Sequence, residues 1–284
     1  MKEILHKHGY LCTFKFSSLG LSNMVGTGWE KRQVNWNLFA TRLGKLTAIA
    51  THALYRRAFL RHGVAPAIEH QTVMRTLPFD LVADVGANRG QFSLLCRQLR
   101  PGARIVAFEP LPQPADIHRA VFAADARVML HSVALAPTRG EMTMNVSRRD
   151  DSSSLLPISK AQTENYPGTE RIDGHRVHVA PLTDFISEND LAGHSLLKID
   201  VQGFELEVLK SAIPLLPAFD WIYAECSFVS LYDGQALAEE VIAFLASHGF
   251  VLSGKFNLSY GKAGALLQAD LLFVRTEDVA ASAS

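Results

Sequence analysis

Past residue 62, short apolar runs alternate with segments of helical periodicity, and this alternation limits the fold more than any other feature of the chain. Apolar runs of strand length are found at 79–85, 104–108, 128–135, 196–200, 221–226, 250–253 and 267–275. Helical spacing of apolar residues is found between them at 90–99, 114–124, 205–212 and 237–248. The pattern predicts an α/β fold with a mostly parallel seven-stranded sheet and helices on both faces. No helical pattern joins the last two strands, so we expect an antiparallel strand at the C-terminal end.

One internal stretch, residues 141–182, breaks this alternation. It holds two expected strands, 142–147 and 175–179, and a polar loop over 148–154. An insertion between the third and fourth strands of the sheet would lie over its carboxyl edge, where α/β sheets bind ligands. We expect the polar loop to be either a solvated loop or a lid that closes over a ligand.

The N-terminal part of the chain follows a different pattern. Residues 1 to about 30 show no clean periodicity, whereas apolar residues recur at helical spacing from 36 to 61. We therefore expect a leader and helical extension at 1–62, an α/β domain at 63–276 and a disordered tail at 277–284.

Charge limits the partners of this chain. Its 284 residues include 28 Lys and Arg and 28 Asp and Glu, so the formal net charge is zero. This neutrality argues against a nucleic-acid partner, which would call for a basic face. The end of the N-terminal helix is locally basic, with Arg56, Arg57 and Arg61. We expect a solvated cap on the domain there, although such a helix also suits a membrane surface or a partner protein. The oligomeric state is left open.

The cysteines and the hydropathy favour a cytoplasmic location. Cys12, Cys96 and Cys226 are an odd number without metal-binding spacing, which favours a reducing compartment over a disulfide framework. No apolar run approaches the ~20 residues that span a bilayer. Lys15 interrupts the apolar stretch near the N-terminus, which makes it a poor secretory signal.

A glycine-containing turn follows the first expected strand and opens the first helix of the domain. The segment runs Asp84-Val85-Gly86-Ala87-Asn88-Arg89-Gly90. Gly86 and Gly90 would let the backbone approach a ligand, and the helix would offer unpaired N–H groups to a carboxylate. Asp84 could face a ligand ammonium group. Asn88 stands where a dinucleotide motif has its second glycine, which makes a pyrophosphate ligand less suitable.

Three further acidic residues stand at the ends of later strands. Glu109 lies about 20 positions past the glycine turn, where α/β nucleotide sites hold a ribose through both hydroxyls. Asp200 follows the fourth strand, beside the expected point where the strand order reverses, and Glu225 ends the next strand. Carboxylates at these positions could remove a proton from a substrate or hold magnesium. Glu205 follows in a first helical turn and has a structural explanation there, since it complements the helix dipole.

Together these segments resemble the FkbM family of methyltransferases. The resemblance rests on DVGANRGQFSLL, AFEPLP, DDSSSLLP, LLKIDVQGFELEVLKSA, YAECSFVSLYDGQAL and LLQADLLFVR, in that order from about 79 to 275. It implies a Rossmann-like class I methyltransferase sheet, S-adenosylmethionine as methyl donor, and methylation of a hydroxyl on a sugar, glycan or polyketide-type acceptor. By position it implies a set of donor contacts, with the last two near the adenine: Asp84, Gly86, Asn88, Gly90, Glu109, and Ser132 or Val133.

The resemblance and the acidic strand ends lead to one expected mechanism and two rivals. We expect Asp200 to act as the general base or to orient the acceptor, with Glu225 in reserve, and the site residues to work without a metal; magnesium held by the two carboxylates is the variant. One rival is an NAD-dependent oxidoreductase on a similar sheet. The other is a scaffold that binds S-adenosylmethionine without turnover.

Overall fold

The computed structural model describes residues 36–261 and 264–276. The expected leader, residues 1 to about 30, and the expected tail, 277–284, lie outside the described residues. From Asn37 onward the chain forms one compact unit.

The unit is built on a seven-stranded sheet with the strand order β3-β2-β1-β7-β8-β10-β9. Neighbouring strands from β3 to β8 run parallel, whereas β10 runs antiparallel to both β8 and β9. The predicted mostly parallel sheet with an antiparallel C-terminal element is therefore confirmed. The strands are β1 (Leu81–Val85), β2 (Arg104–Phe108), β3 (Val128–His131), β7 (Ser195–Ile199), β8 (Trp221–Ser227), β9 (Phe250–Tyr260) and β10 (Leu266–Arg275).

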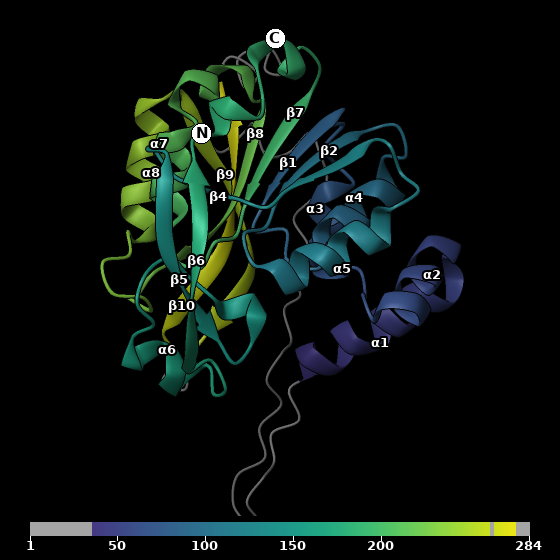
Figure 1. The fold of residues 1–284 in the computed structure, drawn as a ribbon, viewed down its shortest axis with the longest axis horizontal. Coiled ribbons are helices and arrows are strands. Elements are labelled where there is room, and N and C mark those ends of the chain that lie inside the picture. The colour runs from purple at the N-terminus through teal and green to yellow at the C-terminus, as the bar shows by residue number, and fades with distance from the viewer. Residues whose placement is uncertain (1–35, 262–263, 277–284) are drawn as a thin grey trace, which may run out of the picture. The chain divides into compact units, whose positions relative to one another are not determined.

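Helices cover both faces of this sheet (Figure 1). One face packs against α3 (Gln71–Met74), α4 (Gln91–Leu99) and α5 (Pro112–Phe122), and the other against α7 (Glu205–Ser211) and α8 (Ala238–Ser247). The sequence explains this sandwich, because β1 and β7 are buried at every position and so offer apolar side chains to both layers. Short 3₁₀ helices connect the elements: η2 (Ile68–His70), η3 (Asp150–Ser152), η4 (Leu182–Asp184), η5 (Glu188–Leu191) and η6 (Ile213–Ala218).

The prediction of one strand over 128–135 was wrong. After β3 the chain leaves the main sheet, and β4 (Ala134–Leu135) pairs with β6 (Arg171–Ala180) in a second sheet of order β4-β6-β5. Leu135 packs in the core cluster that also contains residues of β6, so burial in a different layer explains why apolar residues resume after His131-Ser132. The insertion also contains β5 (Gly140–Ser147) and α6 (Lys160–Asn165).

The helix expected over 36–61 is two helices, α1 (Trp36–Thr51) and α2 (Ala53–His62). His52 between them has an extended backbone, which interrupts the helical hydrogen bonds. Tyr55 and Ala58 of α2 pack with residues of α4 and α5, so this part of the extension belongs to the core. No helix in the described part of the chain is both long and apolar enough to cross a membrane.

Candidate active site

A cavity of about 290 Å³ lies where the strand order reverses. Strand β1 pairs with β2 on one side and with β7 on the other, so the chain segments that leave β1 and β7 diverge above the sheet edge. The predicted residues Gly86, Asn88, Glu109, Val133 and Asp200 all line this cavity. The predicted cluster at the switch point is therefore assembled from segments far apart in the sequence.

Gly86 joins the two sides of the switch point. It has a left-handed φ of 75°, and a Cβ atom there would overlap the carbonyl oxygen of Asp200. Its N–H donates to the carbonyl of Phe108 at 3.1 Å, while the N–H of Asp200 donates to the carbonyl of Val85 at 3.0 Å. Glycine is therefore required here by the neighbouring backbone. The sequence argument had explained this glycine by room for a ligand; the structure explains it by the Asp200 carbonyl.

Gly90 serves the packing of two helices. Its φ is 92°, and an added Cβ would lie 2.8 Å from the Phe122 ring and 2.9 Å from the His118 ring. Gly90 does not line the cavity. The structure thus gives this glycine a role in seating α4 on α5, and the predicted ligand contact finds no geometric support.

Glu109 is held by the backbone. One carboxylate oxygen accepts the N–H of Asn88 at 3.0 Å and the other accepts the N–H of Leu111 at 2.8 Å. Asn88 presents its N–H from a left-handed conformation with φ of 46°. Burial raises the pKa of Glu109 to about 7, although the two backbone hydrogen bonds act against this rise. Each oxygen keeps a lone pair that can accept from a hydroxyl group.

The two residues predicted near an adenine lie differently. Val133 is buried and lines the cavity. The Ser132 hydroxyl accepts from Arg119 at 2.5 Å, and Ser132 does not line the cavity. Of the pair, the structure therefore favours Val133 as the apolar wall.

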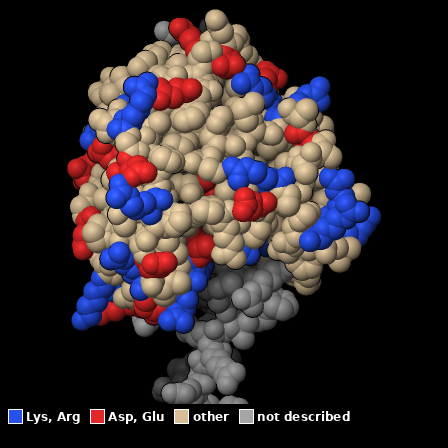
Figure 2. Space-filling view, in the orientation of Figure 1, with Lys and Arg blue, Asp and Glu red and all other residues tan. Residues whose placement is uncertain are grey.

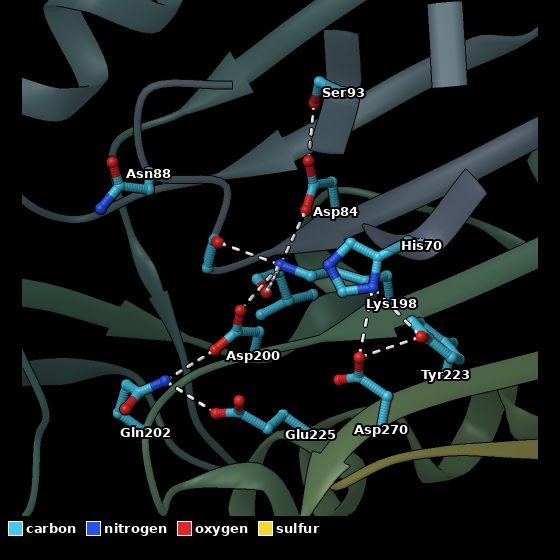
Figure 3. A network of polar contacts seen from close by, with 12 residues as sticks. His70, Asp84, Asn88, Ser93, Lys198, Asp200, Gln202, Tyr223, Glu225 and Asp270 are labelled. Atoms are coloured by element: carbon cyan, nitrogen blue, oxygen red, sulfur yellow. Dashed lines mark hydrogen bonds and ion pairs between the residues drawn. The ribbon is translucent and has the colours of Figure 1, made fainter. Parts of the chain in front are cut away.

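Asp84 lies beneath the cavity and not at its wall. It is fully buried, accepts from the Ser93 hydroxyl at 2.7 Å, and has Lys198 Nζ 3.3 Å from its other oxygen (Figure 3). The predicted contact with a ligand ammonium group must therefore be corrected, because the cation next to Asp84 belongs to the protein. Its role in this structure is to neutralise Lys198.

Lys198 is a residue that the sequence argument missed. It is 4% exposed, lines the cavity, and donates to the carbonyl of Gly86 at 3.1 Å. Its ammonium group also lies 3.7 Å from Asp200. Burial alone would lower the pKa of Lys198, but the carboxylates of Asp84 and Asp200 outweigh it and raise the pKa. A lysine inside an otherwise apolar strand was the signal that could have revealed it.

Asp200 and Glu225 are bridged by the side-chain amide of Gln202. Its Nε2 donates to Asp200 at 2.8 Å and to Glu225 at 2.9 Å (Figure 3). The Asp200 side chain is 38% exposed, whereas Glu225 does not line the cavity. Burial, followed by the nearby charges of Asp200, Asp270 and Glu205, raises the pKa of Glu225 well above its usual range. The Gln202 amide thus lies between the two carboxyl groups, at the position where the variant mechanism would have a metal ion.

The polar loop of the insertion reaches the glycine turn. Arg89 donates to one oxygen of Asp150 through Nε at 2.9 Å and through Nη2 at 2.7 Å. Asp150 lines the cavity, and Tyr232 fastens the same loop by donating to the carbonyl of Ser152 at 3.2 Å. The loop is thus a wall of the cavity, as the lid hypothesis requires.

His70 is the second missed residue. It lies in η2, lines the cavity, and points Nδ1 at Asp270 of β10, 3.2 Å away (Figure 3). No local motif surrounds it in the sequence. In the described ranges 36–261 and 264–276, no group of three or more His, Cys, Asp or Glu side chains is arranged to hold a metal ion.

Comparisons with known proteins agree with this geometry. The model of the methyltransferase FkbM domain matches residues 84–252. The chain is 30% identical to the 2-O-methyltransferase NoeI of Sinorhizobium fredii (strain NBRC 101917 / NGR234) over 64% of its length and 78% of the relative. It is 29% identical to the 31-O-demethyl-FK506 methyltransferase FkbM of Streptomyces tacrolimicus, over 69% of its length and 78% of the relative.

Among solved structures, a precorrin-6y C5,15-methyltransferase from Geobacter metallireducens GS-15 matches 73% of this chain and 88% of its own, with 14% identity and a TM-score of 0.41. This likeness is too weak to add to the assignment. The family match covers more than half of the chain, including the glycine turn and the segments that follow β2, β7 and β8. The chain therefore belongs to the FkbM-domain family of methyltransferases and folds as a class I methyltransferase.

Proposed function

We propose that this methyltransferase transfers a methyl group from S-adenosylmethionine to a hydroxyl group of a sugar, glycan or polyketide-type acceptor. The observation that carries the proposal is that Glu109 and Asp200 line one cavity, joined by the backbone at Gly86. The printed names of two relatives, a 2-O-methyltransferase and a 31-O-demethyl-FK506 methyltransferase, support oxygen as the methylated atom.

The residues present suit the donor. The free lone pairs of Glu109 would accept from the two ribose hydroxyls, and each such bond to a charged group is worth roughly 1.5–3 kcal/mol. Buried Leu111 and Val133 give an apolar wall suited to adenine. Gly86 and Asn88, on the turn before α4, would lie along the amino-acid portion. When bound, the donor supplies an electrophilic methyl group on a positively charged sulfur.

Asp200 would work on the acceptor side. Its partly exposed carboxylate is held by Gln202 and by Lys198, so it can accept a hydrogen bond from an acceptor hydroxyl in a fixed position. Such a group orients the nucleophile or takes its proton, and positioning is the larger part of catalysis in a displacement of this kind. Glu225 would support Asp200 through Gln202, whose amide nitrogen donates to both carboxyl groups.

The test combines donor binding with turnover. We expect calorimetric titration to detect S-adenosylhomocysteine and not NAD, and isotope-labelled S-adenosylmethionine to label a member of a panel of nucleotide sugars, envelope oligosaccharides and polyketides. Asp200→Asn should lose turnover while its affinity for S-adenosylhomocysteine stays within a few-fold. Asp116→Asn, on the exposed surface, is the matched control. NAD binding would favour the oxidoreductase rival, and donor binding without any methylated product would favour the scaffold.

We also infer that the basic surface of α1 and α2 contacts an anionic bilayer, in a cytoplasmic location. Residues 36–68 contain five Lys and Arg residues and no Asp or Glu. Leu46 and Leu60 are 60% and 75% exposed there, and Figure 2 shows basic side chains gathered over α2, whereas charges of both signs are mixed elsewhere on that face. Basic and large apolar side chains on one helical surface suit a lipid headgroup layer.

Vesicle sedimentation of the full chain checks this contact. We expect binding to phosphatidylcholine vesicles that contain about one third phosphatidylglycerol, and weak binding to phosphatidylcholine alone. Arg57→Ser with Leu60→Ser should reduce binding, whereas Arg127→Ser with Ile213→Ser, which removes an exposed arginine and an exposed isoleucine elsewhere, should not. Equal behaviour of the two double variants would contradict the inference.

A further inference from the structure

His70 and Asp270 lie in close contact beside the cavity. Nδ1 of His70 lies 3.2 Å from Oδ2 of Asp270 and 3.1 Å from the Tyr223 hydroxyl (Figure 3). Asp270 is 7% exposed and stands opposite Glu225 in the register of β10 and β8. The pair thus lies at the level of the strand ends where Asp200 and Glu225 are found.

The surroundings of Asp270 favour its ionised form. Its Oδ2 accepts from Tyr223 at 3.0 Å and from Nδ2 of Asn257 at 2.7 Å, in addition to the contact with His70. Burial alone would raise the pKa of Asp270, but the hydrogen bonds, together with the charge that His70 carries once it is protonated, outweigh it and lower the pKa. Nδ1 of His70 faces two groups of opposite preference: the Asp270 oxygen can only accept, whereas Nδ2 of Asn257, 3.1 Å away, can only donate. We assign the proton to Nδ1, toward the ionised Asp270 oxygen, so that Nε2 carries the lone pair.

Nε2 of His70 is available to a molecule in the cavity. It hydrogen-bonds to no described residue, and the His70 side chain is 16% exposed where it lines the cavity. The Phe92 ring holds His70 and Lys198 in one corner: it contacts the imidazole edge to face at 5.5 Å, and the Lys198 ammonium lies 5.4 Å from its centroid. An oriented imidazole lone pair and a buried cation therefore share one wall.

We propose that His70 is a catalytic residue that removes the proton of the acceptor hydroxyl through Nε2, and that Asp270 is its positioning residue. The inference rests on the proposed function. It assigns removal of the hydroxyl proton to His70 and orientation of the acceptor to Asp200. The hydroxyl proton moves to Nε2 as the oxygen forms its bond to the methyl carbon and the carbon–sulfur bond breaks, leaving a neutral thioether. The positive charge lost from sulfur reappears on the imidazolium, against the Asp270 carboxylate, and is released as a proton to water.

The first test is independent of any acceptor. In protein labelled with ¹⁵N-histidine, His70 is assigned by comparison with His70→Asn, and long-range ¹⁵N–¹H correlations then report its tautomer. We expect the Nδ1–H form in the wild type and a shift away from it in Asp270→Asn. An Nε2–H tautomer in the wild type would overturn the proposal, because no lone pair would then face the cavity.

The second test uses the acceptor found by the labelled-donor panel. His70→Asn keeps a donor toward Asp270 but lacks Nε2, so turnover should fall ~10²–10⁴-fold while affinity for S-adenosylhomocysteine stays within a few-fold; His70→Gln serves if the first variant does not fold. His194→Asn is the matched control, since His194 also faces a carboxylate, Asp220 at 3.5 Å, on an exposed surface. Retained turnover, or loss of donor binding with loss of turnover, would refute the role. If no acceptor in the panel is methylated, that result counts against the proposed function. The tautomer measurement would still show whether Asp270 orients His70 as proposed.

Discussion

Glu109 and Asp200 both follow a parallel strand and line the same cavity, but they are held in opposite ways. Each oxygen of Glu109 accepts a main-chain N–H, and the residue is 6% exposed. Asp200 is held by the side chains of Gln202 and Lys198, and its own side chain is 38% exposed. The first site is thus shaped by the backbone of the glycine turn, whereas the second is shaped by side chains.

This contrast suggests a division of work within the cavity. A backbone cradle persists under most substitutions, which suits a ligand that does not change, such as a common methyl donor. Side-chain positioning can be altered one residue at a time, which suits an acceptor that differs between relatives.

The largest effect on stability is expected at Gly86, where the segments that carry Glu109 and Asp200 meet. Gly86→Ala combines a left-handed backbone with overlap against the Asp200 carbonyl, so we expect the free energy of unfolding to fall by about 3 kcal/mol or more. Urea denaturation measures it. Gly63→Ala is the control, because Gly63 has a similar φ of 70° and nothing within 4 Å of an added Cβ. If both variants lost equal stability, the cost would come from the φ angle alone. The backbone at Asp200 would then not constrain residue 86.

On the side-chain side, Lys198→Met should leave Asp84 buried without its cation. Breaking a buried ion pair costs about 3–5 kcal/mol, so a large loss of stability is expected in thermal unfolding. Lys210→Met removes an exposed partner of Glu207 and should cost less than about 1 kcal/mol. Adding Asp84→Asn to Lys198→Met should restore part of the loss; no restoration would show that the pair is not the cause.

On the backbone side, Glu109 should make binding depend on pH. Its pKa is raised to about 7 by burial, and ribose hydroxyls donate best to the ionised form, so affinity for S-adenosylhomocysteine should rise as pH increases through about 7. The folded protein holds this proton more tightly than the unfolded chain. Stability from this group is therefore present below about 4.5 and declines between 4.5 and about 7.

Titration calorimetry across this pH window measures the effect on binding. Glu109→Gln should remove the pH slope and weaken binding about 10-fold to 100-fold, because one backbone N–H then faces an amide donor. Glu207→Gln, on the exposed part of α7, should keep the wild-type slope. A slope that survives in Glu109→Gln would assign the titration to another group.

The smallest effect is expected at the loop that spans the two sides. Arg89→Gln and Asp150→Asn should each weaken donor binding by a few-fold, with a coupling in the double variant of about 0.2–1 kcal/mol, because the pair is partly exposed. Arg148→Gln, whose partner Glu170 lies at 3.7 Å, is the control in the same loop. Additive effects in the double variant would mean that the ion pair does not hold the loop.

The fold could be predicted from apolar periodicity because most strands of the main sheet are continuous buried runs. The same rule failed at 128–135, because it joined the apolar residues on both sides of His131-Ser132 into one strand, whereas the chain leaves the main sheet at this polar pair. It also missed the break at His52, which lies inside a regular helical pattern.

At the site, the acidic residues that follow the strands were predictable, because parallel strands bring their carboxyl ends to one edge of the sheet. Asp84 resembled a ligand contact until Lys198, more than a hundred residues later, proved to be its partner. His70 and Asp270 come from opposite ends of the chain, so only the folded structure brings them together.

The contact of Gly86 with the Asp200 carbonyl has a consequence for engineering. The segments that follow β1 and β7 fit one another at the atomic level, with no free space for an added methyl group between them. If only one of these segments were replaced by that of a relative, it would not fit the segment that remains. The segments that follow β1 and β7 should therefore be exchanged together.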